Sequence, residues 1–234
     1  MSKLFLCGGG CGDQCKETYQ VFREVLDTTK PLLYIPLAMP FEEHTPEECF
    51  AWITHEMKEA EIHVPSIEVV RSYEEIPERD FSEYCALFIG GGNTFSLLNG
   101  LKESGAFAKV KEYIEGDGIV FGSSAGEIIF GKDIMTAIPS DPNNVGLTDT
   151  EGFDVLSGIS LDAHYTNPKT EEEHVRVTEF LTKYSIEHET VIALPEEDTL
   201  FINEGKATVL GSRPYYVFEN GNRLEKQPGA EIDD

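Results

Sequence analysis

The residues best able to do chemistry lie where an apolar run meets a short apolar helix. Residues 122–126 read Gly-Ser-Ser-Ala-Gly, after the run 119–121 and before the run 128–130. Gly-x-Ser-x-Gly between a strand and a helix is typical of a nucleophile elbow, because flanking residues without bulk permit the tight turn. Ser124 is therefore the candidate nucleophile, beside helix N–H groups that can stabilise an oxyanion, and Ser123 is expected to point away. Alternatively, Ser124 only caps the helix.

An activated serine needs a base, and His164 is the candidate. It ends the strand-like run 159–163, downstream of Ser124, where a parallel sheet would bring the two to one edge. A lone histidine is more often a structural residue, so the candidacy of His164 rests on its position at the end of a predicted strand. The other histidines lie in loops, in a predicted helix or in charged runs; they are His44, His55, His63, His174 and His188. Of these, His174 is expected on a solvated helix face.

The base in turn needs an acid to hold its tautomer. Glu196 is the first acid after the apolar run 191–194, which places it at a predicted strand end. Asp141, in a Pro-Ser-Asp-Pro loop, is the alternative acid. With 43 acidic residues in the chain, spacing alone leaves both open.

A second strand-to-helix junction carries three glycines before Asn93. Its bare N–H groups could hold phosphate, but the stretch lacks both the P-loop lysine and the spacing of a dinucleotide fingerprint. A hydrolase needs an oxyanion donor from a neighbouring loop, and the Gly92 N–H could supply it. A tight turn without a ligand explains the same pattern.

These candidates require a sheet that brings strand ends together. Apolar runs of four to six residues alternate with amphipathic stretches, which predicts an α/β fold: a doubly wound, mostly parallel sheet flanked by helices. The stretch 46–60 predicts one helix, begun by a capping box of Thr45 and Glu48, with Phe50, Ile53 and Met57 facing inward.

The last third of the chain changes character. Residues 199–203, 207–210 and 215–218 predict a short antiparallel C-terminal extension, with turns at Glu204-Gly205 and Asn220-Gly221. The expected organisation is one hydrolytic domain over residues 1–223, followed by an acidic, frayed tail over residues 224–234.

Charge restricts the partners. The chain has 234 residues and a formal net charge of −25, without a basic stripe. This argues against nucleic acid and against an anionic membrane surface, since both need clustered Lys and Arg. The N-terminal stretch lacks a secretory signal pattern, and five cysteines suggest reduced thiols in a cytoplasm. Cys7, Cys11 and Cys15 are interpreted as loop thiols, because no second cluster completes a metal site.

Taken in order, four blocks resemble the dipeptidase E and cyanophycinase family of serine peptidases, within a likeness over residues 3–218. The blocks are Gly90-Gly91-Gly92-Asn93-Thr94-Phe95, Gly122-x-Ser124-Ala125-Gly126, His164-Tyr165-Thr166-Asn167 and Leu194-Pro195-Glu196. The resemblance implies a fold like class I glutamine amidotransferases, with serine replacing their cysteine. It implies Ser124 as nucleophile, His164 as base, and the N–H groups of Gly92 and Ala125 as oxyanion hole. For the third member it favours Glu196, with an aspartate near Asp141 as the alternative.

Substrate contacts are expected from Asn93, Glu127 and Arg176. Relatives that cleave aspartyl dipeptides carry Glu-Thr-Arg-x-x-Arg after the histidine, and only the second arginine, Arg176, is retained here. Glutamates at 171–173 argue against an aspartyl preference, because such a side chain needs a cation. Glu127 stands where relatives carry a small or uncharged residue, and it is expected either to bind a substrate α-amino group or to face solvent.

The expectation is a cytoplasmic serine peptidase that hydrolyses small peptides through an acyl-enzyme intermediate. It would need no cofactor and no metal, and would be a monomer or a homodimer whose partner is a small peptide, with neither nucleic acid nor membrane. One alternative is a cyanophycinase-like hydrolase of branched or modified peptides. The other is a catalytically silent binding module on the same fold.

Overall fold

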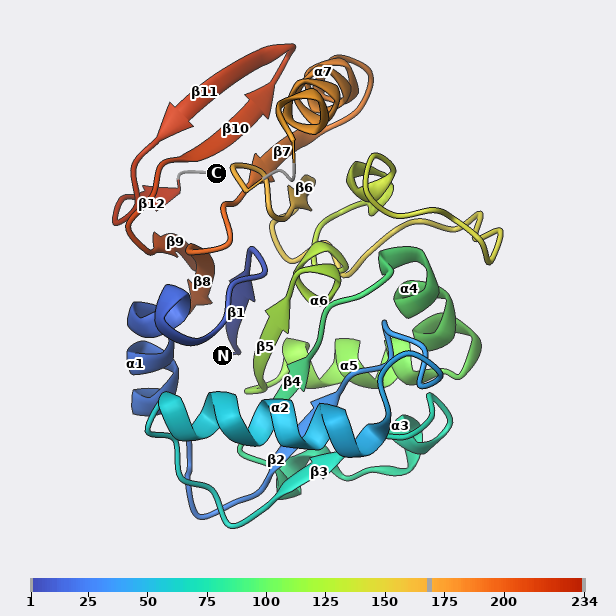
Figure 1. Cartoon of the computed structure of the whole chain (residues 1–234), viewed down its shortest axis with the longest axis vertical. Helices are drawn as coiled ribbons and strands as arrows, with labels where there is room; N and C mark the ends of the chain where they lie inside the picture. Colours follow the sequence, from blue (N-terminus) through green and yellow to red (C-terminus); the bar gives the residue numbers. More distant parts are fainter. Residues whose placement is uncertain (1, 168–169, 233–234) are drawn as a thin grey trace.

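A computed structural model of the protein describes residues 2–167 and 170–232. Its main sheet has eight strands in the order β12-β9-β8-β1-β5-β4-β2-β3 (Figure 1). The five strands from β1 to β3 in that order are parallel, and the other three are antiparallel. The strands are β1 (Lys3–Cys7), β2 (Leu32–Ile35), β3 (Ile67–Val69), β4 (Ala86–Ile89), β5 (Ile119–Ser123), β8 (Thr199–Asn203), β9 (Lys206–Leu210) and β12 (Glu231–Ile232).

Helices cover both faces of this sheet, because successive strand residues point to opposite sides. Phe5 and Phe121 face the cluster under α1 and α2, whereas Leu4 and Val120 face the cluster under α4, α5 and α6. This double cover confirms the predicted α/β class. The helices are α1 (Lys16–Val25), α2 (Pro46–Glu59), α3 (Glu75–Glu78), α4 (Thr94–Glu103), α5 (Ala106–Glu115) and α6 (Ala125–Ile128), with 3₁₀ turns at Gly12–Cys15, Phe81–Glu83 and Met135–Ala137.

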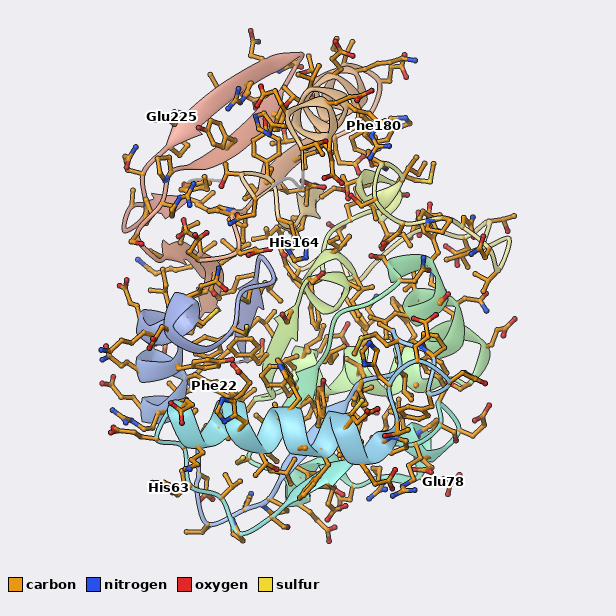
Figure 2. The ribbon with its side chains drawn as sticks, in the orientation of Figure 1. Phe22, His63, Glu78, His164, Phe180 and Glu225 are labelled. Atoms are coloured by element: carbon orange, nitrogen blue, oxygen red, sulfur yellow. The ribbon has the colours of Figure 1, made fainter. Side chains whose placement is uncertain are left out.

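A second sheet, in the order β11-β10-β7-β6, lies beyond the carboxyl ends of the parallel strands and carries α7 (Glu171–Glu187) (Figure 1). Leu181 and Tyr184 of this helix pack against Phe218. In Figure 2, His164 is labelled at the junction between this part and the main sheet. The strands are β6 (Ile159–Asp162), β7 (Thr190–Ala193), β10 (Tyr215–Glu219) and β11 (Asn222–Lys226).

The structure differs from the sequence-based expectation at the C-terminus. The predicted antiparallel strands and both turns are present, but they divide between the two sheets. Residues 224–226, expected to fray, belong to β11, and residues 231–232 form β12 against β9. Residues 233–234 lie outside the described part. No helix in residues 2–167 and 170–232 has the length and apolarity that crossing a bilayer requires.

The predicted helix at 46–60 appears as α2. The Thr45 hydroxyl accepts a hydrogen bond from the Glu48 N–H at 3.2 Å, which completes the expected capping box. Ile53 and Met57 are buried, as expected. Phe50 is 46% exposed, so the inward prediction is wrong for that residue.

The two glycines of the elbow are required by close backbone contacts. A Cβ on Gly122 would lie 2.2 Å from the Gly126 carbonyl oxygen, and a Cβ on Gly126 would lie 2.3 Å from the Ile89 carbonyl oxygen. These distances are far below van der Waals contact. The end of β5, the start of α6 and the end of β4 therefore approach one another as only glycine permits.

We expect Gly126→Ala to lower the free energy of unfolding by about 1–3 kcal/mol, because the added methyl group displaces the backbone of β4. Urea denaturation followed by circular dichroism measures this change. Gly116→Ala is the matched control, since a Cβ there would lie 3.5 Å from its nearest neighbour. Equal stability of the two variants would contradict the steric argument.

Candidate active site

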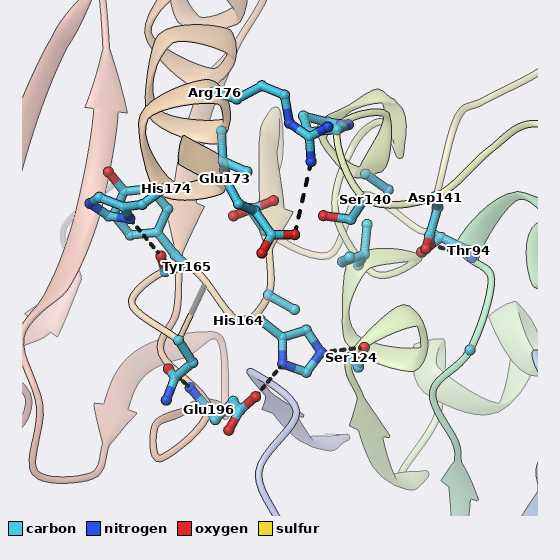
Figure 3. A pocket seen from close by; sticks show the side chains of 18 residues that line it. Thr94, Ser124, Ser140, Asp141, His164, Tyr165, Glu173, His174, Arg176 and Glu196 are labelled. Carbon is cyan, nitrogen blue, oxygen red and sulfur yellow. Dashed lines mark hydrogen bonds and ion pairs between the residues drawn. The ribbon is translucent and has the colours of Figure 1, made fainter. Parts of the chain in front are cut away.

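Three side chains predicted from the sequence form one hydrogen-bonded chain (Figure 3). Ser124 Oγ lies 2.9 Å from His164 Nε2, and His164 Nδ1 lies 2.9 Å from Glu196 Oε1. A carboxylate accepts only, so Nδ1–H donates to Glu196 and Nε2 is left to accept the serine proton. This arrangement can turn a weak hydroxyl into a nucleophile.

Ser124 is held in a strained backbone conformation between β5 and α6. Its φ is 56° and its ψ is −115°, a region that side-chain-bearing residues seldom adopt. Its N–H donates to the Cys7 carbonyl at 3.0 Å, which ties the turn to the end of β1. Ser123 is the last residue of β5, is buried, and is not among the described residues that line the cavity at Ser124.

A glycine run after β1 holds the imidazole in place. The His164 N–H donates to the Gly8 carbonyl at 3.0 Å, and His164 itself has a φ of 58°. Gly9 lies against the ring: a Cβ there would be 2.1 Å from His164 Cε1. The Gly10 N–H donates to the Glu196 carbonyl at 3.0 Å. One short loop therefore positions both the base and the acid.

Glu196 contacts the imidazole, whereas Asp141 does not. Gln14 Nε2 donates to the second carboxylate oxygen of Glu196 at 3.2 Å, and the Glu196 N–H donates to Asn167 Oδ1 at 3.0 Å. Asp141 instead accepts from the N–H and the hydroxyl of Thr94, at 2.8 and 2.6 Å. The structure therefore brings Glu196 to His164 and places Asp141 at the start of α4.

The two predicted oxyanion donors flank the serine. Gly92 lines the cavity at Ser124 with a φ of 139°, and a Cβ on it would lie 2.4 Å from the Ala38 carbonyl oxygen. Ala125 follows Ser124 and begins α6. Neither the Gly92 N–H nor the Ala125 N–H donates a hydrogen bond to another residue in the described part of the chain. Both remain able to bind an oxygen that develops negative charge.

The site opens into a cavity of about 450 Å³ between the main sheet and α7. Arg176, predicted to bind substrate, lines it and lies 3.9 Å from Glu173 (Figure 3). The lining also includes Thr94, Ser140, Asp141, Asp162, Asn167 and His174.

The structure does not place the other two predicted substrate contacts on this lining. Asn93 caps α4: its Oδ1 accepts from the Ser96 N–H at 2.8 Å, and its Nδ2 donates to the Pro142 carbonyl at 3.0 Å. Glu127 is fully buried, and neither of its carboxylate oxygens has a hydrogen-bond partner among the described residues. Glu127 therefore neither faces solvent nor reaches the cavity.

Several site residues were not identified from the sequence. His174, expected on a solvated face, lines the cavity and donates through Nδ1 to the Tyr165 carbonyl at 3.3 Å. Gln14 carries no sequence signal, since its role depends on how η1, the turn at Gly12–Cys15, lies against Glu196. Gly9 had a usable signal, because its glycine run follows an apolar strand as the other two glycine-containing junctions do.

The clustered cysteines are only partly loop thiols. Cys7 ends β1 and Cys15 ends the 3₁₀ turn, both buried, with their sulfurs 3.4 Å apart, whereas Cys11 is exposed. The hydrogen bond from Cys15 lowers the pKa of Cys7 despite its burial. Across the described residues, no group of three or more His, Cys, Asp or Glu side chains has the arrangement of a metal site.

Comparison with known proteins assigns the chain to a family. A family model described as "Peptidase family S51" matches residues 4–210. This match covers most of the chain, and the protein belongs to peptidase family S51.

Individual relatives agree with the family assignment. Proteins named "Peptidase E" from Escherichia coli and Shigella boydii are 31% identical over 142 residues, which is 58% of this chain and 59% of theirs. The matched segment thus spans under two thirds of those relatives.

Solved structures agree in fold. A putative Peptidase E protein from Listeria monocytogenes has a TM-score of 0.69 at 23% identity, covering 91% of this chain and all of that one. A peptidase from an acI-B1 Actinobacterium has a TM-score of 0.73 at 16% identity, covering 100% of this chain and 97% of that one.

We expect Glu127→Gln to reduce the loss of stability at high pH. Burial, and then the charges of Cys7 and Asp162, raise the pKa of Glu127 well above its ordinary value. Above that ordinary value, about 4.3, the folded state keeps a proton that the unfolded chain releases, so the free energy of unfolding falls by up to ~1.4 kcal/mol per pH unit until the raised pKa is passed. The variant lacks this contribution.

Urea denaturation at pH 5, 6, 7 and 8 measures the effect. The stability of Glu127→Gln relative to the wild type should rise steadily across the series. Glu59→Gln, on the exposed side of α2, is the control with the same change of charge. Parallel pH curves for the wild type and Glu127→Gln would contradict the prediction.

Proposed function

We propose that this protein is a serine peptidase that hydrolyses small peptides through an acyl-enzyme intermediate. The observation that carries the proposal is the chain of two 2.9 Å hydrogen bonds from Ser124 through His164 to Glu196, at the edge of an open cavity. Membership of peptidase family S51 supports the same reaction class. The name "Peptidase E" of the relatives supports a peptide substrate.

Acylation would begin with the serine hydroxyl. As Ser124 Oγ attacks the scissile carbonyl carbon, its proton passes to His164 Nε2, and the carbonyl oxygen becomes an oxyanion. Glu196 stabilises the imidazolium that forms. The imidazolium then gives its proton to the amine nitrogen, the C–N bond breaks, and the acyl group remains on Ser124.

The N–H groups of Gly92 and Ala125 would bind the oxyanion during both steps. Loss of one such donor typically costs about 2.7–4 kcal/mol in the barrier. In the second step a water molecule attacks the acyl carbon and His164 accepts its proton. His164 then returns this proton to Ser124 Oγ as the bond between Oγ and the acyl carbon breaks, which releases the carboxylic acid product and restores the serine. All proton transfers thus pass through one imidazole.

Cavity size supports small substrates. At about 450 Å³, the cavity falls in the lower half of the range of roughly 300–1,000 Å³ that is usual for small-molecule sites. It is bounded by α7 on the side away from Ser124 (Figure 3). These dimensions favour a dipeptide or a similarly short peptide over a folded protein.

Labelling with a fluorophosphonate probe tests the nucleophile. We expect one covalent adduct on Ser124, found by mass spectrometry of a tryptic digest, and no adduct in Ser124→Ala. Hydrolysis of a dipeptide mixture, followed by chromatography, should fall by at least ~10³-fold in the same variant. Ser123→Ala is the control. A wild type that neither reacts nor hydrolyses any dipeptide would favour the binding-module alternative.

A methyl group beside the imidazole should also abolish most activity. Gly9→Ala would place its Cβ 2.1 Å from His164 Cε1, and the ring must move from Ser124. We expect kcat to fall by ~10²-fold or more, because both hydrogen bonds of the ring are lost. Gly12→Ala is the matched control: it also has a positive φ, and its added Cβ meets nothing within 4 Å. Similar activity in the two variants would refute this role for Gly9.

A further inference from the structure

Two buried thiols lie in contact behind the loop that positions the base and the acid. Cys7 ends β1 and Cys15 ends the turn η1, and their sulfurs are 3.4 Å apart. Only 0% and 1% of these residues is exposed. A disulfide bond brings two sulfurs to about 2.05 Å, so a small movement of one side chain would join them. The proposed reaction uses neither thiol.

The two thiols differ in their tendency to lose a proton. The hydrogen bond between them lowers the pKa of Cys7 and raises the pKa of Cys15. Cys15 therefore keeps its proton and donates it to the Cys7 sulfur. Oxidants react with a thiolate, and a neighbouring thiol converts the first oxidation product into a disulfide. The pair therefore supplies both of the roles that formation of a disulfide requires.

Only a short turn separates the pair from solvent. η1 is a single 3₁₀ turn, and its residues Asp13 and Gln14 are exposed. Local opening of a short exposed segment costs much less free energy than global unfolding, and here it would uncover Cys15. A molecule as small as hydrogen peroxide can then reach the two sulfurs. A larger oxidant meets the exposed Cys11 first.

One end of this loop is fixed to the nucleophile. β1 pairs with β5 on one side and with β8 on the other, up to and including Cys7. The Cys7 carbonyl accepts the hydrogen bond from the Ser124 N–H at 3.0 Å. The end of β1 is thus held on both sides, and the residue that moves when the two sulfurs join is Cys15.

The other end of the loop contacts the acid. Gln14, which directly precedes Cys15, donates to Glu196 Oε2 at 3.2 Å. Within the same loop, the Gly10 N–H donates to the Glu196 carbonyl at 3.0 Å. A disulfide at Cys15 would draw η1 toward β1 and would move Gln14 relative to Glu196. Displacements of about 1 Å in a catalytic group can lower a rate ~10²-fold.

We propose that Cys7 and Cys15 are a redox-active pair that hydrogen peroxide converts into an intramolecular disulfide, and that this bond lowers turnover at Ser124. The Cys7 thiolate attacks one peroxide oxygen, the O–O bond breaks, and the hydroxide that leaves takes up the proton that Cys7 had released. The Cys15 sulfur then attacks the sulfenic acid on Cys7, the S–O bond breaks, and water leaves with the Cys15 proton.

This sequence oxidises two thiols by two electrons and reduces one peroxide to two water molecules. A dithiol reductant such as dithiothreitol reverses it by thiol–disulfide exchange. The effect on turnover rests on the proposed peptidase function, whereas formation of the bond does not.

Mass spectrometry of one tryptic peptide tests the bond. Residues 4–16 form a single tryptic peptide that contains Cys7, Cys11 and Cys15 and no other cysteine. The protein is treated with hydrogen peroxide, its remaining thiols are alkylated, and it is digested. We expect the peptide to lose two hydrogen atoms and to carry one alkyl group, on Cys11. Reduction with dithiothreitol before alkylation should give three alkyl groups.

Hydrolysis of the dipeptide mixture by the same samples tests the effect on turnover. We expect kcat to fall by ~5-fold or more on oxidation of the wild type, and to return with dithiothreitol. Cys11→Ser is the matched control, and it should keep both the bond and the response. Cys15→Ser and Cys15→Ala should lose both. Circular dichroism of these two variants identifies a folding defect in either, and the reversible response of the wild type requires no variant.

The outcomes separate this inference from the proposed function. Peroxide treatment that oxidises Cys11 but leaves Cys7 and Cys15 as thiols, or that joins Cys11 to either of them, would overturn the redox pair. A bond between Cys7 and Cys15 that leaves hydrolysis unchanged would overturn its effect on turnover. A wild type that forms this bond, but neither hydrolyses dipeptides nor reacts with the fluorophosphonate probe, would keep the redox pair and refute the peptidase.

Discussion

The site depends on one backbone conformation, the left-handed turn at Ser124. Such a turn costs of order 1–3 kcal/mol for a residue with a side chain, and it persists only where the surroundings determine it strongly. Here the Cys7 carbonyl accepts a hydrogen bond from the Ser124 N–H, and the backbone is closely packed on both sides of the serine, at Gly122 and Gly126. The packing of three adjacent parallel strands, β1, β5 and β4, therefore fixes the turn that presents the Ser124 hydroxyl at their carboxyl ends.

The serine, the base and the acid were predictable because each directly follows an apolar strand. β6 and β7 are adjacent parallel strands, so His164 and Glu196 follow strand ends on one side of the second sheet, as residues after parallel strands should. Ser124 instead follows β5 of the main sheet, so the expectation of a single shared sheet edge is wrong for the serine and the base. The choice between Glu196 and Asp141 was not predictable in the same way. Both are acids near the predicted edge of a sheet. Only the packing of η1 and of the β1 loop, residues 8–10, against Glu196 determines which of them contacts His164.

The remaining differences come from long-range packing. Every residue of β11 is exposed, so its sequence shows no alternation of apolar and polar residues from which a strand could be predicted. The strand forms through its pairing with β10, whereas the polar composition of the tail favoured a frayed end. Phe50 fits the helical period of α2 with Ile53 and Met57, but its side chain is exposed to solvent. Asp162 contradicts the rule that charged residues stay outside, which no local pattern reveals.

The β1 loop connects the N-terminal part of the chain to the base and the acid, because residues 8–10 contact His164 and Glu196. The strand that follows the acid, β8, pairs with β1. A polypeptide emerging from the ribosome therefore carries the serine for some time without its two partners. The hydroxyl gains its proton acceptor only after residue 164 has been made, and that imidazole gains its carboxylate only after residue 196 has been made. The complete hydrogen-bonded chain therefore exists only in a polypeptide that has been synthesised through residue 196.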